Sequence, residues 1–415
     1  MASSKSKAAR RSGILGVLLM ILFFAIIVLL IVLIIGVSSS KKRTPQNIGS
    51  DHEIPVDAQN VTELPSEPPF YEVSIVAVGD NLIHDTLYKS GKKDDGTRDY
   101  SSFYENVKAD VQAADIAVIN QETILGGDVR ELSGYPMFNS PQEIGDAAVD
   151  AGFDVFTCAT NHAMDVYEKG IFAELEYFNT KHPEVTYLGL NASEEEYNTI
   201  KYLDVNNIRF ALLNYTYGTN GIPLPSDKPW IVNMLDRKEK IKSDVTTARA
   251  NADVVIVFPH WGTEYRMTPD EEQKQYVKFF SDLGVDIIIG AHPHVIEPAE
   301  WYANKSTGKE TLVYYSMGNF ISHQHDPSSL LGGMVKLTVR KENGKISIIE
   351  PKLVPLVTYY TSTGNGYRFT TYKLSDYTEE LASRHSSHTK YGNNVSPSAM
   401  RSLYEKTISE SFRAD

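Results

Sequence analysis

The sequence contains almost no cysteine and no excess of basic residues. Cys158 is the only cysteine among 415 residues, so folding cannot depend on an internal disulfide. It lies in an apolar run, residues 155–159, and is interpreted as a small buried residue rather than a nucleophile. The formal net charge of −13 is spread along the chain, which predicts a solvated acidic surface and argues against a nucleic-acid partner.

One long apolar run lies near the N-terminus. Residues 14–37 carry no charged side chain, and a helix of this length spans the roughly 30 Å hydrocarbon core of a bilayer. A cleavable signal peptide is the alternative, but its apolar core would be shorter and a small-residue cleavage site would follow it. The length of the run therefore favours an uncleaved, single-pass anchor in the lipid bilayer of the cell membrane.

Basic residues flank this predicted span unequally. Before the span stand Lys5, Lys7, Arg10 and Arg11 with the terminal amine, and after it stand Lys41, Lys42 and Arg43. The positive-inside rule then places residues 1–13 in the cytoplasm and the C-terminal domain outside the cell. Residues 38–70 are polar and dotted with proline, which predicts a flexible linker.

From residue 71 onward, short apolar runs alternate with amphipathic stretches. The apolar runs are typical of strands buried on both faces and occupy residues 71–78, 116–119, 155–157, 208–213, 254–258, 287–289 and 312–315. Helical spacing occurs in residues 102–114, 141–151, 168–179, 236–250 and 270–283. This alternation predicts a layered α/β domain over residues 71–360.

Two further elements are predicted toward the C-terminus. A hairpin joins residues 334–339 to residues 345–351 around the turn residues Asn343 and Gly344. Residues 361–415 form a polar extension with a helix predicted at 396–412, and the sequence assigns this extension no role.

Polar residues gather where the predicted strands end. In an open α/β sheet the carboxyl ends of the strands form the edge at which sites occur. The clusters are Gly79-Asp80 with His84, Asn120-Gln121-Glu122, Asn161-His162 with Asp165, His260-Trp261-Gly262 with Glu264, His292-Pro293-His294, and Ser316-Met317-Gly318-Asn319. Taken singly, Asp80 suits a helix cap, Asn161 suits a turn, and a lone histidine is more often structural than a ligand.

Six such clusters together predict a site for one or two divalent metal ions. A mixture of imidazole, carboxylate and amide oxygen suits Mn, Fe or Zn better than Ca or Mg. His292 and His294 are two residues apart, so an extended backbone directs both imidazoles to one face.

The combination of these motifs, over residues 73–355, resembles the CapA family, which is associated with bacterial capsule and poly-γ-glutamate synthesis. That family in turn resembles the calcineurin-like metallophosphoesterases. The resemblance implies a layered, metallophosphoesterase-like β-sandwich flanked by helices, with a two-metal centre.

The resemblance also implies a role for individual residues. The metal ligands it implies are Asp80, Glu122 as the bridging carboxylate, Asn161, His260, His292 and His294. It implies that His162 protonates the leaving group, and Asp165 is expected to orient that imidazole. Leu82 stands where the phosphoesterases have a further histidine, and His84 follows it at a different spacing. This departure, with Glu in place of Asp at the bridge, leaves one metal ion or two as open alternatives.

Other residues of the clusters are expected to support the ligands or contact the substrate. These are His84, Asn120, Trp261, Glu264, Ser316 and Asn319. Glu264 is predicted to bind His260 from outside the ligand set, and Trp261 to pack beside the site or stack on substrate. His323 and His325 are interpreted as exposed loop histidines.

Three functions are compatible with this pattern. The first is a metal-dependent hydrolase or transferase acting outside the cell on an ester, amide or phosphoryl bond, with the metal polarising that bond and activating water. The second is a non-catalytic subunit that binds an anionic polymer or a membrane polymer-synthase or exporter partner. The third treats the clusters as structural loop residues, which does not explain why three histidine motifs each follow a strand. His162 beside a full ligand set favours the enzyme.

Overall fold

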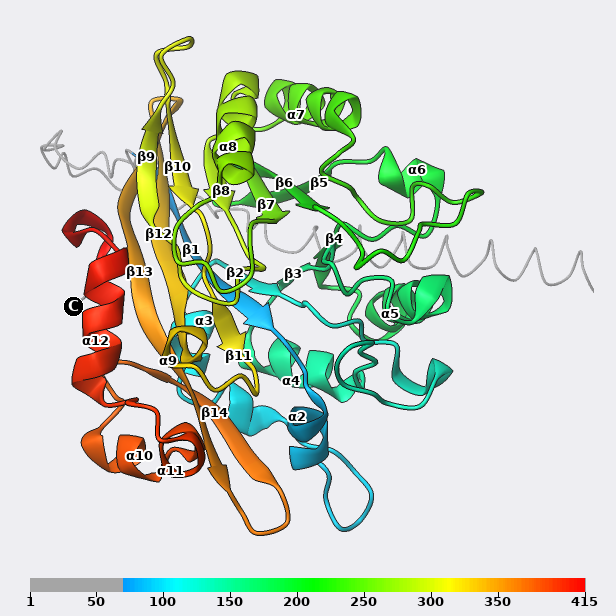
Figure 1. Ribbon diagram of the computed structural model, residues 1–415. Helices are drawn as coiled ribbons and strands as arrows, with labels where there is room; N and C mark the ends of the chain where they lie inside the picture. The colour runs from blue at the N-terminus through cyan, green and yellow to red at the C-terminus, as the bar shows by residue number, and fades with distance from the viewer. Residues whose placement is uncertain (1–69, 415) are drawn as a thin grey trace, which may run out of the picture. The chain divides into compact units, whose positions relative to one another are not determined.

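The computed structural model describes residues 70–414 (Figure 1). The predicted cytoplasmic segment, membrane span and nearly all of the predicted linker lie outside this range. Within residues 70–414, no helix combines the length and apolar character needed to cross a bilayer. The described residues belong to one compact unit with a mixed α/β fold.

Eight strands form the first sheet. Its order is β14-β13-β12-β1-β2-β3-β4, and β11 pairs with β1. The strands are β1 (Phe70–Asn81), β2 (Ile116–Asn120), β3 (Val155–Thr157), β4 (Thr186–Leu188), β11 (Asn319–Ile321), β12 (Leu331–Glu342), β13 (Lys345–Ser362) and β14 (Tyr367–Lys373). Because β1 to β4 are parallel, the carboxyl ends of β1, β2 and β3 meet at one edge.

Six strands form the second sheet, in the order β5-β6-β7-β8-β10-β9. They are β5 (Lys201–Val205), β6 (Ile208–Thr216), β7 (Val254–His260), β8 (Ile287–Ile289), β9 (Ala299–Ala303) and β10 (Glu310–Tyr314). The four central strands are parallel, and β5 and β9 are antiparallel edge strands. This sheet therefore also gathers its parallel carboxyl ends at one edge.

Alternate residues of the second sheet serve two different cores. On β6, Phe210 and Leu212 join the larger core that also contains the strands of the first sheet, whereas Ala211 and Leu213 join a second core. The second core is completed by α7 (Lys238–Asn251) and α8 (Glu271–Leu283), which lie together beside β5 to β8 in Figure 1. The period of two in a strand thus makes each central strand apolar on both faces.

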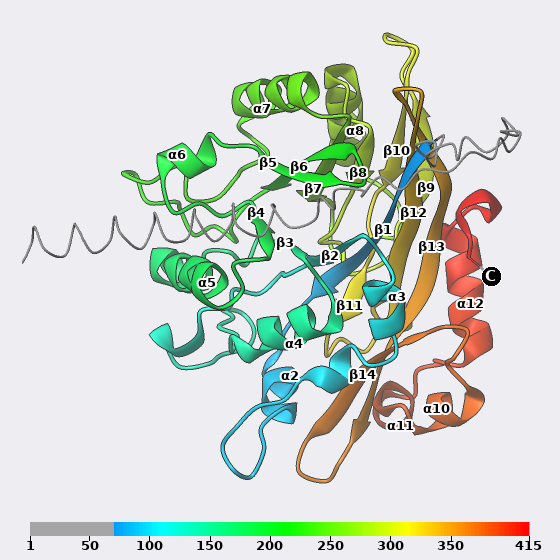
Figure 2. The same ribbon diagram turned by 180° about the vertical axis from the view of Figure 1, so that it is seen from behind.

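The remaining helices are short apart from two. They are α2 (Asp85–Ser90), α3 (Lys108–Gln112), α4 (Glu143–Ala151), α5 (Tyr167–Lys181), α6 (Glu194–Tyr197), α9 (Pro327–Leu330), α10 (Glu379–Arg384), α11 (Ser386–Tyr391) and α12 (Pro397–Thr407), with 3-10 turns Ser101–Phe103, Gly127–Val129 and Glu410–Phe412. Figures 1 and 2 both show α12 alongside β13, where the Tyr404 hydroxyl donates to the Leu353 carbonyl. The segment after residue 361 therefore extends the first sheet through β14 and covers it with α12.

Most predicted elements are confirmed, including the hairpin. Asn343 and Gly344 both have positive φ, as a two-residue turn between right-twisted strands requires. The helix predicted at 102–114 is wrong, because only a 3-10 turn and the five residues of α3 are helical there. Ser102 Oγ and Asn106 Nδ2 instead donate to backbone carbonyls of β14, so tertiary contacts replace a regular helix.

Candidate metal centre

The first sheet contributes oxygen ligands at its carboxyl edge. Asp80 is the penultimate residue of β1, Glu122 lies two residues after β2, and Asn161 lies in the loop after β3. Gly79 permits the close approach of the loop after β10, since a Cβ there would lie 1.8 Å from the Gly318 carbonyl oxygen. The three oxygen-bearing side chains are therefore buried together.

The second sheet contributes the imidazoles. His260 ends β7, and His292 and His294 follow β8. The two later histidines have φ of +102° and +59°, a region that residues other than glycine seldom occupy. Each such residue stores about 1–3 kcal/mol of strain, and strain of this kind concentrates at functional sites. The ring centroid of His292 lies 4.9 Å from that of His260 and 5.8 Å from that of His294.

Asp80 links the two sheets. Its Oδ1 accepts hydrogen bonds from Asn120 Nδ2 at 2.9 Å and from the His292 backbone N–H at 3.2 Å. Its Oδ2 lies 3.0 Å from His294 Nδ1. Asn319 supports the same imidazole, because its Oδ1 lies 3.2 Å from His294 Nδ1 and its Nδ2 donates to the His294 carbonyl. Asp80 and Asn319 thus both hold His294 at its Nδ1, and Asn319 also holds its backbone.

Glu122 lies at the centre of the cluster without a hydrogen-bond partner. It is fully buried, and it is the only carboxylate within residues 70–414 with both oxygens buried and unpartnered. Oε1 lies 3.7 Å from His294 Nε2 and 3.8 Å from His260 Nε2. Burial, with repulsion from Asp80, raises the pKa of this carboxyl well above its usual value. Leaving such a group unsatisfied costs about 1–3 kcal/mol or more, so a cation is the expected partner.

The ligand atoms form three overlapping groups, each within 4.8 Å. They are Asp80–Glu122–His294, Glu122–His260–His292 and Glu264–His292–His294. Glu122 belongs to two of the groups, as the predicted bridging position requires. Asn161 Oδ1 lies 2.9 Å from His260 Nε2, so the amide adjoins the second group. Buried Nδ1 atoms of His260 and His292 also lack partners. The residues present fit a divalent metal, one ion or two.

The imidazoles have opposed electrostatic environments. Burial and the neighbouring histidines hold the pKa of His260 and His292 well below the usual value. Burial also disfavours protonation of His294, but Glu122 and Asp80 outweigh it and raise its pKa to about 9. A metal ligand must be unprotonated, so a metal ion here would replace the His294 proton as the positive charge between the carboxylates.

His162 and Asp165 form a pair beside the ligands. His162 Nδ1 lies 2.7 Å from Asp165 Oδ2, and the same oxygen accepts the Phe138 backbone N–H at 2.7 Å. The Phe138 ring meets the imidazole edge-on at 4.7 Å between centroids. These contacts fix the imidazole, because one nitrogen is bound by a buried carboxylate and the ring is packed against an aromatic side chain.

A cavity of about 830 Å³ opens beside the metal centre and the His162–Asp165 pair. Residues 135–138 form one wall, residues 323–326 form another, and His84, Asn161, Glu264 and His294 line it between them. This volume is typical of sites for small ligands or polymer segments.

The other predicted site residues fall into different places. Asn120 supports Asp80 by donating a hydrogen bond to its carboxylate. Ser316 Oγ donates to the Val295 carbonyl and so shapes the loop that leads to Asn319, the residue that supports His294. Glu264 is near His292 and His294 rather than bound to His260, whose Nε2 faces Asn161 and Glu122.

Trp261 is buried, donates to the Tyr315 carbonyl and packs in the second core, so it does not line the cavity. His84 lines the cavity wall and belongs to none of the three ligand groups within residues 70–414. Leu82, at the position of the missing histidine, is buried beside it.

Sequence reasoning missed Asn220. Its Nδ2 lies 3.3 Å from His162 Nδ1, and its Oδ1 accepts from Asn161 Nδ2 at 3.1 Å. It follows β6 within a glycine-flanked loop, so the rule that polar residues after strand ends form sites would have found it. His323, interpreted as an exposed loop residue, instead lines the cavity and is partly buried.

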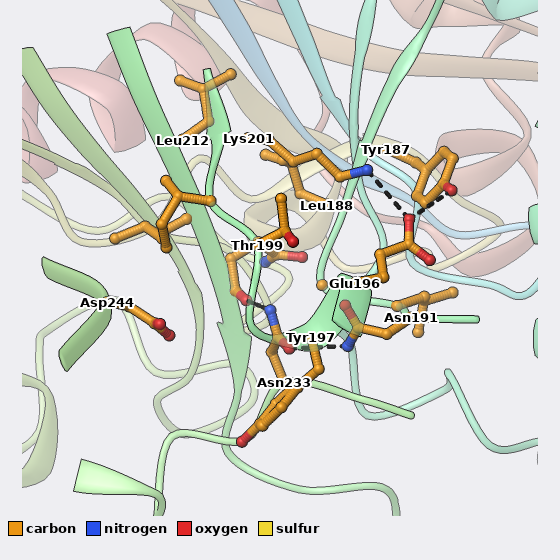
Figure 3. Close-up of a pocket in the computed structure, with 15 residues that line it drawn as sticks. Tyr187, Leu188, Asn191, Glu196, Tyr197, Thr199, Lys201, Leu212, Asn233 and Asp244 are labelled. Atoms are coloured by element: carbon orange, nitrogen blue, oxygen red, sulfur yellow. Dashed lines mark hydrogen bonds and ion pairs between the residues drawn. The ribbon is translucent and has the colours of Figure 1, made fainter. Parts of the chain in front are cut away.

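A second, much smaller cavity lies near β4 and β6 (Figure 3). It holds about 30 Å³, room for one or two water molecules, between residues such as Tyr187, Glu196, Lys201 and Asp244. Figure 3 shows Lys201 and Tyr187 both reaching Glu196. Its charged groups already have partners, so it is a structural gap.

Comparisons with known proteins identify the family of this chain. The family described as bacterial capsule synthesis protein PGA_cap matches residues 74–324. The chain is 34% identical over 185 residues to the PGA biosynthesis protein CapA of Bacillus subtilis (strain 168), covering 42% of this chain and 44% of that protein. It is 31% identical over 191 residues to the capsule biosynthesis protein CapA of Bacillus anthracis, covering 45% and 44%. The alignments span less than half of these relatives.

Among solved structures, the NAD nucleotidase of Haemophilus influenzae is similar with a TM-score of 0.44 and 13% identity, covering 83% of this chain and 64% of that chain.

The family match includes every residue of the three ligand groups and the His162–Asp165 pair. The chain belongs to the bacterial capsule synthesis protein PGA_cap family.

Proposed function

We propose that this protein is a metal-dependent hydrolase or transferase that acts on an ester, amide or phosphoryl bond during the synthesis of a capsule or related polymer. The single observation that carries the proposal is the His162–Asp165 pair, which lies beside an unsatisfied ligand set and lines a large cavity. A structural metal requires the ligands but does not require a positioned proton donor at a cavity wall.

The role of His162 follows from its hydrogen bonds. Asp165 Oδ2 accepts from Nδ1, which leaves Nε2 as the nitrogen that carries a proton toward a leaving group. Asp165 holds the ring in this orientation, while Asn220 contacts the same ring nitrogen. A divalent ion held by Glu122 and its neighbours supplies Lewis-acid polarisation of the scissile bond and activation of water.

The alternative is a non-catalytic subunit that binds an anionic polymer or a membrane synthase partner. A metal ion in the centre would supply positive charge for such a polymer, and the relatives named for capsule and PGA biosynthesis are compatible with either role. In both cases we expect the chain to be anchored by residues 14–37, with the described domain outside the cell. Protease treatment of intact cells tests that location, since a protected domain would be cytoplasmic.

The catalytic role is tested with His162→Ala in the full chain, purified in detergent and loaded with Mn, Fe or Zn. The probes are p-nitrophenyl phosphate, bis-p-nitrophenyl phosphate and γ-glutamyl-p-nitroanilide. We expect the variant to retain its metal and melting temperature and to lose about 10²–10⁴ in turnover, the usual value of general acid–base catalysis.

The matched control is His182→Ala. His182 Nε2 lies 2.8 Å from Asp146 Oδ1, so it is a second His–Asp pair, away from the cavity. This control should leave turnover unchanged. Equal turnover in wild type and His162→Ala, or loss of metal from that variant, would remove His162 from the proposed role.

A further inference from the structure

The exposed tyrosines of the described domain gather around the cavity. Five tyrosines within residues 70–414 have strongly exposed side chains, namely Tyr135 (79%), Tyr167 (56%), Tyr265 (54%), Tyr391 (47%) and Tyr217 (42%). Tyr135 and Tyr265 line the cavity. Tyr217 packs on His292 with 4.6 Å between ring centroids, and Tyr391 stacks on the cavity residue His325 at 4.2 Å. Only Tyr167 has no contact of this kind.

The cavity has no lysine or arginine side chain. None of the described residues that line it is Lys or Arg. The guanidinium of Arg130 lies behind the wall and donates to the carbonyls of Asp165 and Met137. Lys390 donates to the Tyr367 hydroxyl. The carboxylate of Glu264 lines the cavity as part of a ligand group, and the exposed carboxylate of Asp326 gives negative fixed charge away from the metal centre.

Several polar groups that line the cavity are free to bind a ligand. His323 Nε2 is buried without a hydrogen bond, and the carboxylate of Asp326 and the hydroxyl of Tyr135 belong to exposed residues at the cavity. Burial lowers the pKa of both His84 and His323 to about 4, so their imidazoles are neutral near pH 7. Neutral imidazole both donates and accepts, and carboxylate only accepts.

We propose that this cavity binds a carbohydrate, an uncharged segment of glycan, and presents one attached ester, amide or phosphoryl group to the metal centre. The inference rests on the proposed function and narrows its substrate class. Sugar rings have apolar C–H faces that lie against exposed tyrosine rings, which combine a rigid apolar face with a polar end. Sugar hydroxyls can donate hydrogen bonds to the Asp326 carboxylate and to the neutral imidazoles of the cavity.

The same features disfavour a poly-glutamate chain. Each carboxylate of such a chain would approach the carboxylate of Asp326 with no lysine or arginine in the cavity to compensate the repulsion. The metal centre can neutralise the reacting group but not the repeating charges of the chain.

The C-terminal extension completes the sugar-facing wall. Ser387 Oγ and Asn393 Nδ2 both donate to the His325 carbonyl, at 2.6 and 2.7 Å, and Tyr391 covers the His325 ring. These residues lie beyond the family match, which ends at residue 324. The extension therefore positions His325, which lies just beyond the matched segment, at this wall of the cavity.

The test is calorimetric titration of the metal-loaded full chain in a detergent without sugar. The ligands are maltotetraose, cellotetraose and chitotetraose, with hexa-γ-glutamate as the competing polymer. We expect at least one tetrasaccharide to bind and hexa-γ-glutamate to bind at least tenfold more weakly. Tyr135→Ala and Tyr265→Ala should each weaken the sugar at least fivefold, whereas Tyr167→Ala, with a side chain as exposed as that of Tyr265, should not.

Three outcomes would overturn the inference. They are tighter binding of hexa-γ-glutamate than of any sugar, failure of all three sugars at 10 mM, or equal losses in the cavity and control tyrosine variants. Because binding is measured without turnover, the two proposals fail separately. If a sugar binds but no probe is hydrolysed, the proposed enzymatic function is wrong. If a probe is hydrolysed but hexa-γ-glutamate binds more tightly than any sugar, the proposed glycan substrate is wrong.

Discussion

Two glutamates in this domain show how differently a carboxylate can be held. Glu196, in the small gap of Figure 3, accepts hydrogen bonds from the Tyr187 hydroxyl, Lys201 Nζ and the Ala192 backbone N–H. Burial opposes its ionisation, but these donors outweigh burial and lower its pKa. Glu122 is more deeply buried, has no donor on either oxygen, and has a pKa raised well above the usual value.

The difference separates a structural carboxylate from one that awaits a ligand. Glu196 is satisfied by the chain itself, so its loss should affect stability and nothing else. Glu122 is surrounded by imidazoles and by Asp80, which are side chains of the kinds that bind metal. A bound metal ion would balance its negative charge.

The largest expected effect is on metal content and turnover in Glu122→Gln. Glutamine keeps the shape of the side chain and removes its charge, so two nearby dications would repel with less compensation. We expect metal per chain to fall from about two to about one, with turnover reduced at least about 10²-fold. Glu196→Gln is the control and should keep its metal. A wild-type stoichiometry near one would refute the paired centre and indicate Leu82 as the reason.

Next in size is the stability conferred by metal. A metal present at about 1,000 times its Kd should stabilise the wild type by about 4 kcal/mol, measured as the difference in free energy of unfolding with and without chelator. In His292→Ala/His294→Ala two ligands are lost, and we expect a difference below about 1 kcal/mol together with loss of most metal. His182→Ala should behave as wild type. A double variant that retains its metal would exclude these histidines from the centre.

A third carboxylate lies between the two extremes. Glu297 is buried, with Gln273 Nε2 donating to one oxygen at 2.6 Å and no partner on the other. Burial raises its pKa to about 8, so the unfolded chain ionises first and stability is lost as pH rises from about 4.5 to about 8. Glu297→Gln should remove this loss and stabilise the protein at pH 8 by about 1–3 kcal/mol. Parallel pH profiles of the two proteins would contradict this.

The smallest expected effect is on stability in Glu196→Gln. The variant loses an ion pair at the edge of the gap, which should lower the free energy of unfolding by about 0.5–1 kcal/mol at pH 7. Because the folded pKa is lowered, this contribution is present above the unfolded pKa near 4.5 and is lost as pH falls through the folded value. Denaturant titrations at pH 7 and pH 3 should therefore show the difference only at pH 7.

The strands were predictable because they are buried on both faces. Runs such as residues 254–258 and 287–289 are apolar throughout, since alternate side chains enter two separate cores. The irregular conformation within residues 102–114 was not predictable, because Ser102 and Asn106 donate to carbonyls of β14, more than 250 residues away along the chain. Local periodicity carries no information about such a partner.

By itself, the sequence determined which residues can bind metal and that they follow strand ends. Those properties depend on residue type and local pattern, which every short segment carries on its own. Only the tertiary structure decided that the first sheet supplies the oxygens and the second the imidazoles, that Glu264 lies near His294 rather than on His260, and that residues 135–138 and 323–326 face one cavity. These are contacts between distant segments, and they form only when the two sheets and the C-terminal extension pack together around the larger core.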